Sequence, residues 1–164
     1  MGHPQVQATT IEQPKIVQNE EQPDGSSVTG VRGIIQDTIT GNGKPVAGVK
    51  VNETDVSKTT VNGVPLNLPP KEGDATTNNA GQVRDVVGLL APARSASEDK
   101  PLVQALSTQA VRVTNTNTIT STMPNGTRYS ATSTRVLTNI GPDGKVMPRY
   151  TLTPTQPVVR SLSH

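Results

Sequence analysis

The chain has 164 residues, close to the length of one ordinary domain. It contains no Cys, Trp or Phe and only two Tyr, which excludes disulfides, thiolate metal sites and cysteine nucleophiles and leaves Val, Ile and Leu to build a thin core. The formal net charge is only +2, so disorder throughout the chain is not expected.

The first segment, residues 1–26, mixes Gln, Pro, Glu and Asn with isolated aliphatic residues. A segment of this composition buries too little apolar surface to order itself. We therefore predict an extended N-terminal arm that a neighbouring subunit holds in place. The arm is net acidic, whereas residues 101–164 carry six Lys or Arg against one Asp. This asymmetry favours head-to-tail contact between copies.

Residues 27–91 alternate short aliphatic runs with turn signals. The turns are predicted at residues 40–45, at Asn62-Gly63, at Pro69-Pro70 and at residues 78–81. Turns at this density exclude long helices and predict a β-sandwich core module.

Residues 92–106 contain Pro92, Ser95 and the charged run Glu98-Asp99-Lys100. We expect a surface loop or a short helical turn in this segment.

Residues 107–164 hold the clearest pattern. From Val111 to Thr120, Val, Asn and Ile alternate with Arg and Thr at a period of two, which predicts a strand with one threonine-lined face. Pro124-Asn125-Gly126 supplies a hairpin turn, and residues 141–144 supply a second turn. The segment is therefore predicted to be a three-stranded, Thr-rich β-meander with a tail, packed on the core or on a neighbour.

Two stretches carry a resemblance to a known family. Residues 33–51 (GIIQDTITGNGKPVAGVKV) and residues 76–83 (TTNNAGQV) are similar, in order and spacing, to carboxypeptidase-regulatory-like domains. The resemblance covers roughly residues 30–90. It implies an all-β, Ig-like or transthyretin-like β-sandwich that serves as a non-catalytic accessory, adhesive or structural module of secreted bacterial proteins or larger assemblies. Where that family commonly has an aromatic residue, this chain has Gln82-Val83-Arg84.

The sequence offers few candidate catalytic residues. The two histidines, His3 and His164, lie at the chain ends, where nothing fixes their geometry. No G-x-S-x-G motif occurs, and Gly43-Lys44 lacks the surroundings of a phosphate loop. We expect no enzyme, and we assign no catalytic, cofactor-binding or metal-binding residue.

Two acidic pairs are weighed as ligand sites. Glu53 with Asp55, and Asp74 with Asp85, could flank a sugar or hold calcium, but neither pair follows the calcium-loop pattern. Solvated loop charges are the favoured interpretation. Tyr129 and Tyr150 are predicted to be anchors of the core.

Several partner classes are not expected. The basic residues of the last third are scattered singly, without the clusters and aromatic platforms of nucleic-acid binding. No stretch approaches the ~18 apolar residues that would span a bilayer, so membrane insertion is not expected. The first ten residues carry no secretory signal pattern.

The favoured hypothesis is a non-enzymatic structural subunit of a virion or an extracellular assembly, such as a phage head-decoration protein, a fibre protein or a filament-forming protein. It would form a homo-oligomer, or join other subunits, through its arm and its β edges. The alternative is a secreted bacterial adhesion module or a carbohydrate-binding accessory module, which would be monomeric.

Overall fold

The computed structural model describes residues 3–162 and is mostly β-structure, in two antiparallel sheets. The first sheet has four strands: β1 (Gln5–Glu21), β2 (Ser27–Gly41), β3 (Lys44–Pro45) and β7 (Gln82–Pro92). The second sheet has seven strands: β4 (Lys50–Val61), β5 (Val64–Leu66), β6 (Lys71–Thr76), β8 (Val111–Thr122), β9 (Arg128–Ile140), β10 (Val146–Pro154) and β11 (Val158–Ser161). The predicted all-β class is thus confirmed.

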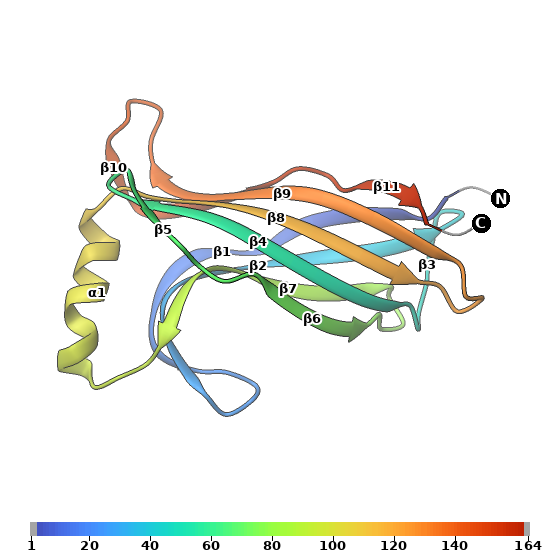
Figure 1. Cartoon of the computed structure of the whole chain (residues 1–164), viewed down its shortest axis with the longest axis horizontal. Helices are drawn as coiled ribbons and strands as arrows, with labels where there is room; N and C mark the ends of the chain where they lie inside the picture. The colour runs from blue at the N-terminus through green and yellow to red at the C-terminus, as the bar shows by residue number, and fades with distance from the viewer. Residues whose placement is uncertain (1–2, 163–164) are drawn as a thin grey trace.

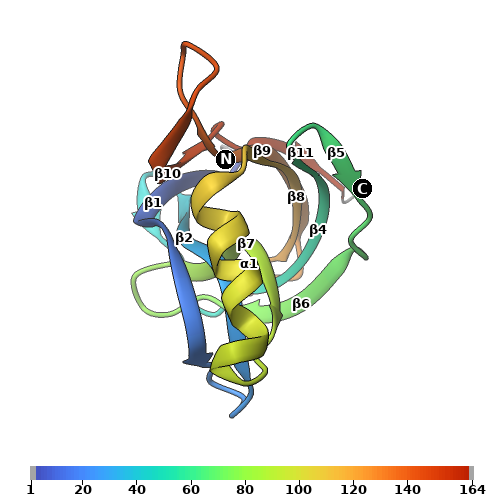
Figure 2. The ribbon, with the colours of Figure 1, turned by 90° about the vertical axis from the view of Figure 1, so that its left-hand side faces the viewer.

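The two sheets curve around a common interior, which is visible when the molecule is viewed along its strands (Figure 2). The long strands run the length of the molecule, and β1 begins and β11 ends at the end opposite α1 (Ala96–Thr108) (Figure 1). Helix α1 lies across the other end of the interior (Figure 2). No helix between residues 3 and 162 is long and apolar enough to cross a membrane.

The sheets meet along two seams of different character. At the first seam, β1 lies beside β10, and glutamine side chains join the two sheets. The Gln156 amide accepts from the backbone N–H of Ala8 at 3.0 Å and donates to its carbonyl at 3.1 Å. The Gln13 side chain accepts from the backbone N–H of Leu152 at 3.0 Å. These amides satisfy backbone groups as a paired strand would.

The second seam, between β6 and β7, is not bridged in this way. Strand β6 pairs with β4, and β7 pairs with β2. No pairing joins β6 to β7 in the described structure. We call this the open seam.

Apolar side chains fill the interior in two separate clusters. The cluster nearer α1 consists of Ala8, Val31, Ile35, Val87, Leu106, Val111, Val113, Leu137, Tyr150 and Leu152. The cluster nearer the chain ends consists of Val6, Ile39, Val49, Val51, Val83, Ile119 and Ala131. The predicted thin, aliphatic core is therefore divided in two.

The segment expected to be an extended arm held by a neighbouring subunit is part of the chain's own fold over its described residues. Strand β1 pairs with β2 from Gln5↔Thr40 to Glu21↔Ser27 and buries Val6, Ala8 and Val17. A strand that pairs with a neighbour satisfies its backbone groups whatever its side chains. A segment that contains only isolated aliphatic residues can therefore be ordered by its own chain, without a second subunit.

Residues 92–106, expected to form a surface loop or a short helical turn, instead contain most of a longer helix. Thirteen residues form α1, which begins at the Ser95 cap, where the hydroxyl accepts from the backbone N–H of Glu98 at 3.3 Å. Glu98 and Asp99 lie in the first turn, where acidic groups suit the helix dipole. This cap and acidic first turn are the sequence signal for a full helix, where only a loop or a short helical turn was predicted.

Residues 27–91 and residues 107–164 were expected to form separate modules, but in the structure they are joined. Strand β4 pairs with β8 along its whole length, from Lys50↔Thr122 to Val61↔Val111. Strands β8, β9 and β10 do form the predicted meander. The two segments therefore share one sheet and one interior.

Candidate functional site

A band of polar side chains crosses the interior between the two apolar clusters. Its members share inward-facing positions near the middle of their strands, and on four strands they lie between residues of the two clusters. On β2, for example, Asp37 lies between Ile35 and Ile39, and on β7, Asp85 lies between Val87 and Val83. We call this band the polar layer. It comprises Asp37, Glu53, Asp55, Ser57, Asp85, Asn115, Asn117, Ser133 and Arg135.

Strand register brings these residues together. On the second sheet, Asp55 is opposite Asn117, and Ser57 is opposite Asn115. Asn115 is in turn opposite Arg135 on β9. The first sheet contributes Asp37 and Asp85 from neighbouring strands, facing Arg135 across the interior.

Arg135 is the centre of the layer. Its guanidinium forms ion pairs with Asp37, at 3.2 Å between Nη2 and Oδ2, and with Asp85, and its Nη1 lies 3.9 Å from Oδ1 of Asp55. The side chains of Arg135 and Asp37 have no exposed surface, whereas those of Asp55 and Asp85 are 12% and 16% exposed. With Glu53, four carboxyl groups therefore surround one buried cation.

The amides of the layer are only half satisfied. Asn117 donates to Oδ1 of Asp55, and Asn115 donates to the Ser57 hydroxyl, each at 2.9 Å. Several buried polar atoms have no hydrogen-bond partner in the described structure: Oδ1 of Asp37, Oε1 of Glu53, Oδ1 of Asn115, Oδ1 of Asn117, Oγ of Ser133 and Nε of Arg135. Acceptors predominate among these atoms, and the oxygens of Asn115 and Asn117 are two of them.

Burial changes the proton affinity of the layer. It raises the pKa of Glu53 to about 8, and the nearby charges of Asp85 and Asp37 add to that effect. Burial also raises the pKa of Asp37 and of Asp85 to about 6, although the Arg135 charge opposes both shifts. Asp55 further raises the pKa of Asp85 by repulsion. The layer can therefore exchange protons near neutral pH.

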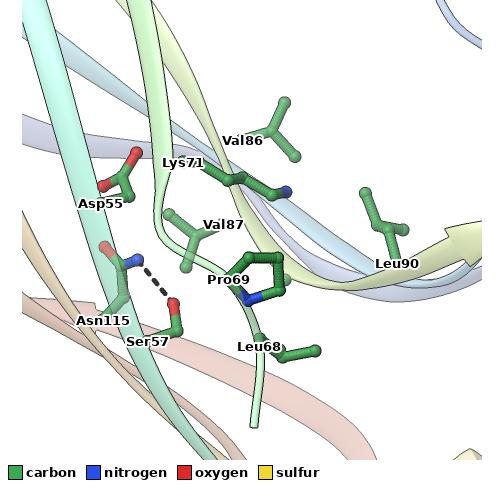
Figure 3. Close-up of a pocket in the computed structure, with 10 residues that line it drawn as sticks. Asp55, Ser57, Leu68, Pro69, Lys71, Val86, Val87, Leu90 and Asn115 are labelled. Carbon is green, nitrogen blue, oxygen red and sulfur yellow. Dashed lines mark hydrogen bonds between the residues drawn. The ribbon is translucent and has the colours of Figure 1, made fainter.

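A cavity of about 150 Å³ connects the layer with the open seam. Asp55, Ser57 and Asn115 lie on one side of it, and an apolar wall lies on the other (Figure 3). The wall consists of Leu68, Pro69, Val86, Val87, Gly88 and Leu90. Lys71, at the start of β6, completes the lining. The cavity is therefore amphipathic, with its polar side continuous with the polar layer.

The acidic residues weighed from the sequence separate into two groups. The expectation of solvated loop charges is wrong for Glu53, Asp55 and Asp85, which lie on strands and face the interior. Asp74 is exposed on β6, where its carboxylate accepts from the Asn52 amide at 2.8 Å. Asp74 and Asp85, weighed together from the sequence as a possible ligand pair, therefore do not form one; Asp85 lies with Asp55.

Sequence reasoning missed Asp37, Asn115 and Arg135 altogether. Each lies at an inward position of a period-two strand, and that placement was the available signal. A charged residue at such a position is normally taken to mark a solvent-facing strand face. Among residues 3–162, no group of three or more histidine or acidic side chains is arranged to hold a metal ion.

The remaining candidates have simple roles. Tyr150 is buried, as predicted, and its hydroxyl donates to the carbonyl of Leu106. Tyr129 is only half-buried, and its ring centroid lies 5.8 Å from that of His3. His164 lies outside the described residues.

Comparison with models of known protein families, with curated proteins and with solved structures gave no match. Function is therefore inferred from the residues of this chain.

Proposed function

We propose that this chain is a non-enzymatic structural subunit that joins a second copy of itself by strand pairing at the free edge of β7. The setting would be a virion or an extracellular assembly, which is supported by the composition of long, threonine-rich strands around a thin aliphatic core. The observation that carries the proposal is the unpaired, eleven-residue edge of β7 at the open seam.

One edge of β7 is fully occupied, and the other is available. The strand pairs with β2 from Val28↔Pro92 to Thr38↔Gln82. Its other edge faces the cavity and β6 without strand pairing in residues 3–162. Unpaired backbone N–H and C=O groups along such an edge form a template for another strand.

Three other edge strands, β3, β5 and β6, carry features that oppose pairing, and β7 carries fewer of them. Strand β6 has charged residues along its length, such as Lys71, Glu72 and Asp74. Strands β3 and β5 are two and three residues long and contain proline. Strand β7 has no lysine, and its proline is its last residue. Short edges, charges and proline are the usual protections against edge pairing.

A second copy suits this edge by symmetry. Two β7 strands that pair antiparallel about a two-fold axis use the same surface on both subunits. The first sheet would then continue across the pair. Val86 is 39% exposed on β7 and would pack against the partner.

We also propose that the two sheets pack as a β-sandwich of the transthyretin-like kind. What supports this is the resemblance of residues 30–90 to carboxypeptidase-regulatory-like domains. The turn that carries part of the resemblance has Asn42 and Gly43 at positive φ. It connects β2 to β3, which pair as a hairpin in the first sheet.

The test is the mass of the full chain in solution, by light scattering behind a sizing column. We expect the wild type at twice 17.2 kDa or as larger particles, and Val86→Lys at 17.2 kDa, because a lysine on an edge strand opposes pairing. Val56→Lys is the matched control. Val56 is 48% exposed on β4 and lies in the second sheet, opposite Thr116 of β8, so this variant should keep the wild-type mass.

Two results would overturn the proposal. A wild type that stays at 17.2 kDa over the whole accessible concentration range would favour the monomeric adhesion or carbohydrate-binding module instead. An association that Val86→Lys and Val56→Lys weaken equally would remove β7 as the interface.

A further inference from the structure

Three exposed turns of the chain contain an asparagine followed by a glycine: Asn42-Gly43, Asn62-Gly63 and Asn125-Gly126. We propose that Asn42 is a site of spontaneous covalent modification, at which the neighbouring backbone and water convert the side-chain amide to a carboxylate. Hydrogen bonds protect the other two asparagines from the same reaction. This inference goes beyond the proposed self-association and does not depend on it.

An Asn-Gly step places an electrophile and a nucleophile side by side. The backbone nitrogen of the glycine forms a bond to Cγ of the asparagine, and the side-chain nitrogen leaves with the backbone proton as ammonia. Water then opens the resulting five-membered succinimide ring at either carbonyl, which gives aspartate or isoaspartate. Glycine suits the reaction because it has no Cβ to hinder its nitrogen. The rate therefore depends on how easily the two groups can reach the geometry of attack.

Of the three turns, Asn42-Gly43 is the most weakly held. Among residues 3–162, neither the Asn42 side chain nor the Gly43 N–H takes part in a hydrogen bond. The turn joins β2 to β3, and β3 is only two residues long, so two residue pairs close the hairpin. A hairpin with so few pairs opens locally at little cost. The peptide unit between Asn42 and Gly43 can therefore rotate toward the Asn42 side chain.

Asn62 is attached to the segment that follows α1. Its backbone N–H donates to the carbonyl of Ala110 at 2.7 Å, and its side-chain Oδ1 accepts from the backbone N–H of Ala110 at 2.9 Å. Rotation of the Asn62 side chain toward the nitrogen of Gly63 would break the second of these bonds. Asn62 is therefore protected even though the residue is exposed.

At Asn125-Gly126 both reacting groups are occupied. The N–H of Gly126, which has to give up its proton, donates to the carbonyl of Met123 at 2.9 Å. The side-chain Oδ1 of Asn125 accepts from the backbone N–H of Thr127 at 3.0 Å. Since all three asparagines are exposed, exposure does not distinguish them. The hydrogen bonds do, and they favour reaction at Asn42.

The first experiment is incubation of the full chain in mildly alkaline buffer made with heavy-oxygen water, followed by digestion in ordinary water and peptide mass spectrometry. Heavy oxygen enters a side chain only where the amide is replaced during the incubation. In the folded chain we expect modification at Asn42 to be at least about fivefold faster than at Asn62 or Asn125, because those two must first lose hydrogen bonds. Modification of Asn62 or Asn125 as fast as that of Asn42 would overturn the proposal.

The same incubation in guanidinium chloride separates the effect of the fold from that of the local sequence. Each asparagine is followed by glycine, so in the unfolded chain the three rates should be similar. The advantage of Asn42 should therefore disappear on unfolding. An advantage that persists unchanged in denaturant would overturn the structural explanation, because it would come from the sequence alone.

Variants assign the product to Asn42. The reaction adds a carboxylate, so anion-exchange chromatography separates the modified chain from the starting chain. Asn42→Gln should slow the appearance of this acidic form at least about fivefold, because the longer side chain would have to form a six-membered ring. Asn125→Gln makes the same change in another exposed turn and should leave the rate near that of the wild type. An acidic form that appears at the wild-type rate in Asn42→Gln would overturn the assignment.

Discussion

Arg135 of β9 and Asp37 of β2 form an ion pair between the two sheets in which neither side chain has any exposed surface, with 3.2 Å between Nη2 and Oδ2. The pair connects the sheets at the level where the apolar core is interrupted. Burying two charges costs solvation energy, which is recovered only while both partners are present. The pair therefore makes the polar layer sensitive to the loss of either charge.

Replacement of Arg135 by methionine is expected to lower the free energy of unfolding by about 3–5 kcal/mol near neutral pH, because Asp37 and Asp85 would remain buried without their cation. Urea denaturation followed by circular dichroism measures the loss. The deficit should shrink at about pH 5, where both carboxyls can be protonated. Arg84→Met, at an exposed position on β7, is the control and should stay near wild type. An equal, small effect of both changes would contradict this prediction.

The stability of the wild type is expected to fall as pH rises from about 4 to about 8. Carboxyls titrate near 4 in an unfolded chain, whereas burial holds the pKa of Asp37 and Asp85 at about 6 and that of Glu53 at about 8. In this range the folded state binds more protons than the unfolded state, so raising the pH favours unfolding. Urea midpoints measured across this range give the slope, and a rise in stability would contradict the prediction.

Glu53→Gln tests the largest contribution to that slope. The amide cannot ionise. We therefore expect the free energy of unfolding of the variant to equal that of the wild type at about pH 5 and to be at least about 1 kcal/mol higher at about pH 9. Glu72→Gln, on the exposed strand β6, is the control, and its stability should change with pH as that of the wild type does. If Glu53→Gln loses stability equally at both pH values, Glu53 acts through packing rather than through its charge.

Gln156→Leu is expected to cost about 1–3 kcal/mol, because it removes both hydrogen bonds that its amide makes to the Ala8 backbone and leaves those groups without partners. Faster amide hydrogen exchange at Ala8 is the local measurement. Gln104→Leu makes the same change at an exposed position of α1 and should leave that exchange unchanged. Unaltered protection of Ala8 in Gln156→Leu would show that the first seam does not depend on this amide.

Tyr150→Phe tests how α1 is attached to the second sheet. The Tyr150 hydroxyl donates to the Leu106 carbonyl, and its loss leaves a buried acceptor unsatisfied at a cost of about 1–2 kcal/mol. Exchange of the α1 amides should accelerate more than that of the strands. Tyr129→Phe is the natural control, since that ring is only half-buried. A uniform change in exchange across all elements would argue against a local role.

The sequence by itself determined the local structure of much of this chain. Alternation at a period of two placed the strands of the 107–164 meander, since side chains of a strand point to opposite faces in turn. Turn residues such as Asn62-Gly63 and Asn125-Gly126 marked where strands reverse, because glycine and asparagine accept positive φ. These signals come from residues that are close together in the sequence, so they can be recognised without knowing which strands pair.

Only the tertiary structure decided which face of each strand is buried and which strands are neighbours. The alternation on β4 gives Glu53, Asp55 and Ser57 one face and Thr54, Val56 and Lys58 the other, yet the acidic face is the interior one. That choice depends on Arg135, which is eighty residues later than Asp55 and supplies the opposite charge. Strand β1 likewise becomes ordered because β2 satisfies its backbone. The polar layer and its cavity are therefore products of long-range pairing, which local patterns do not encode.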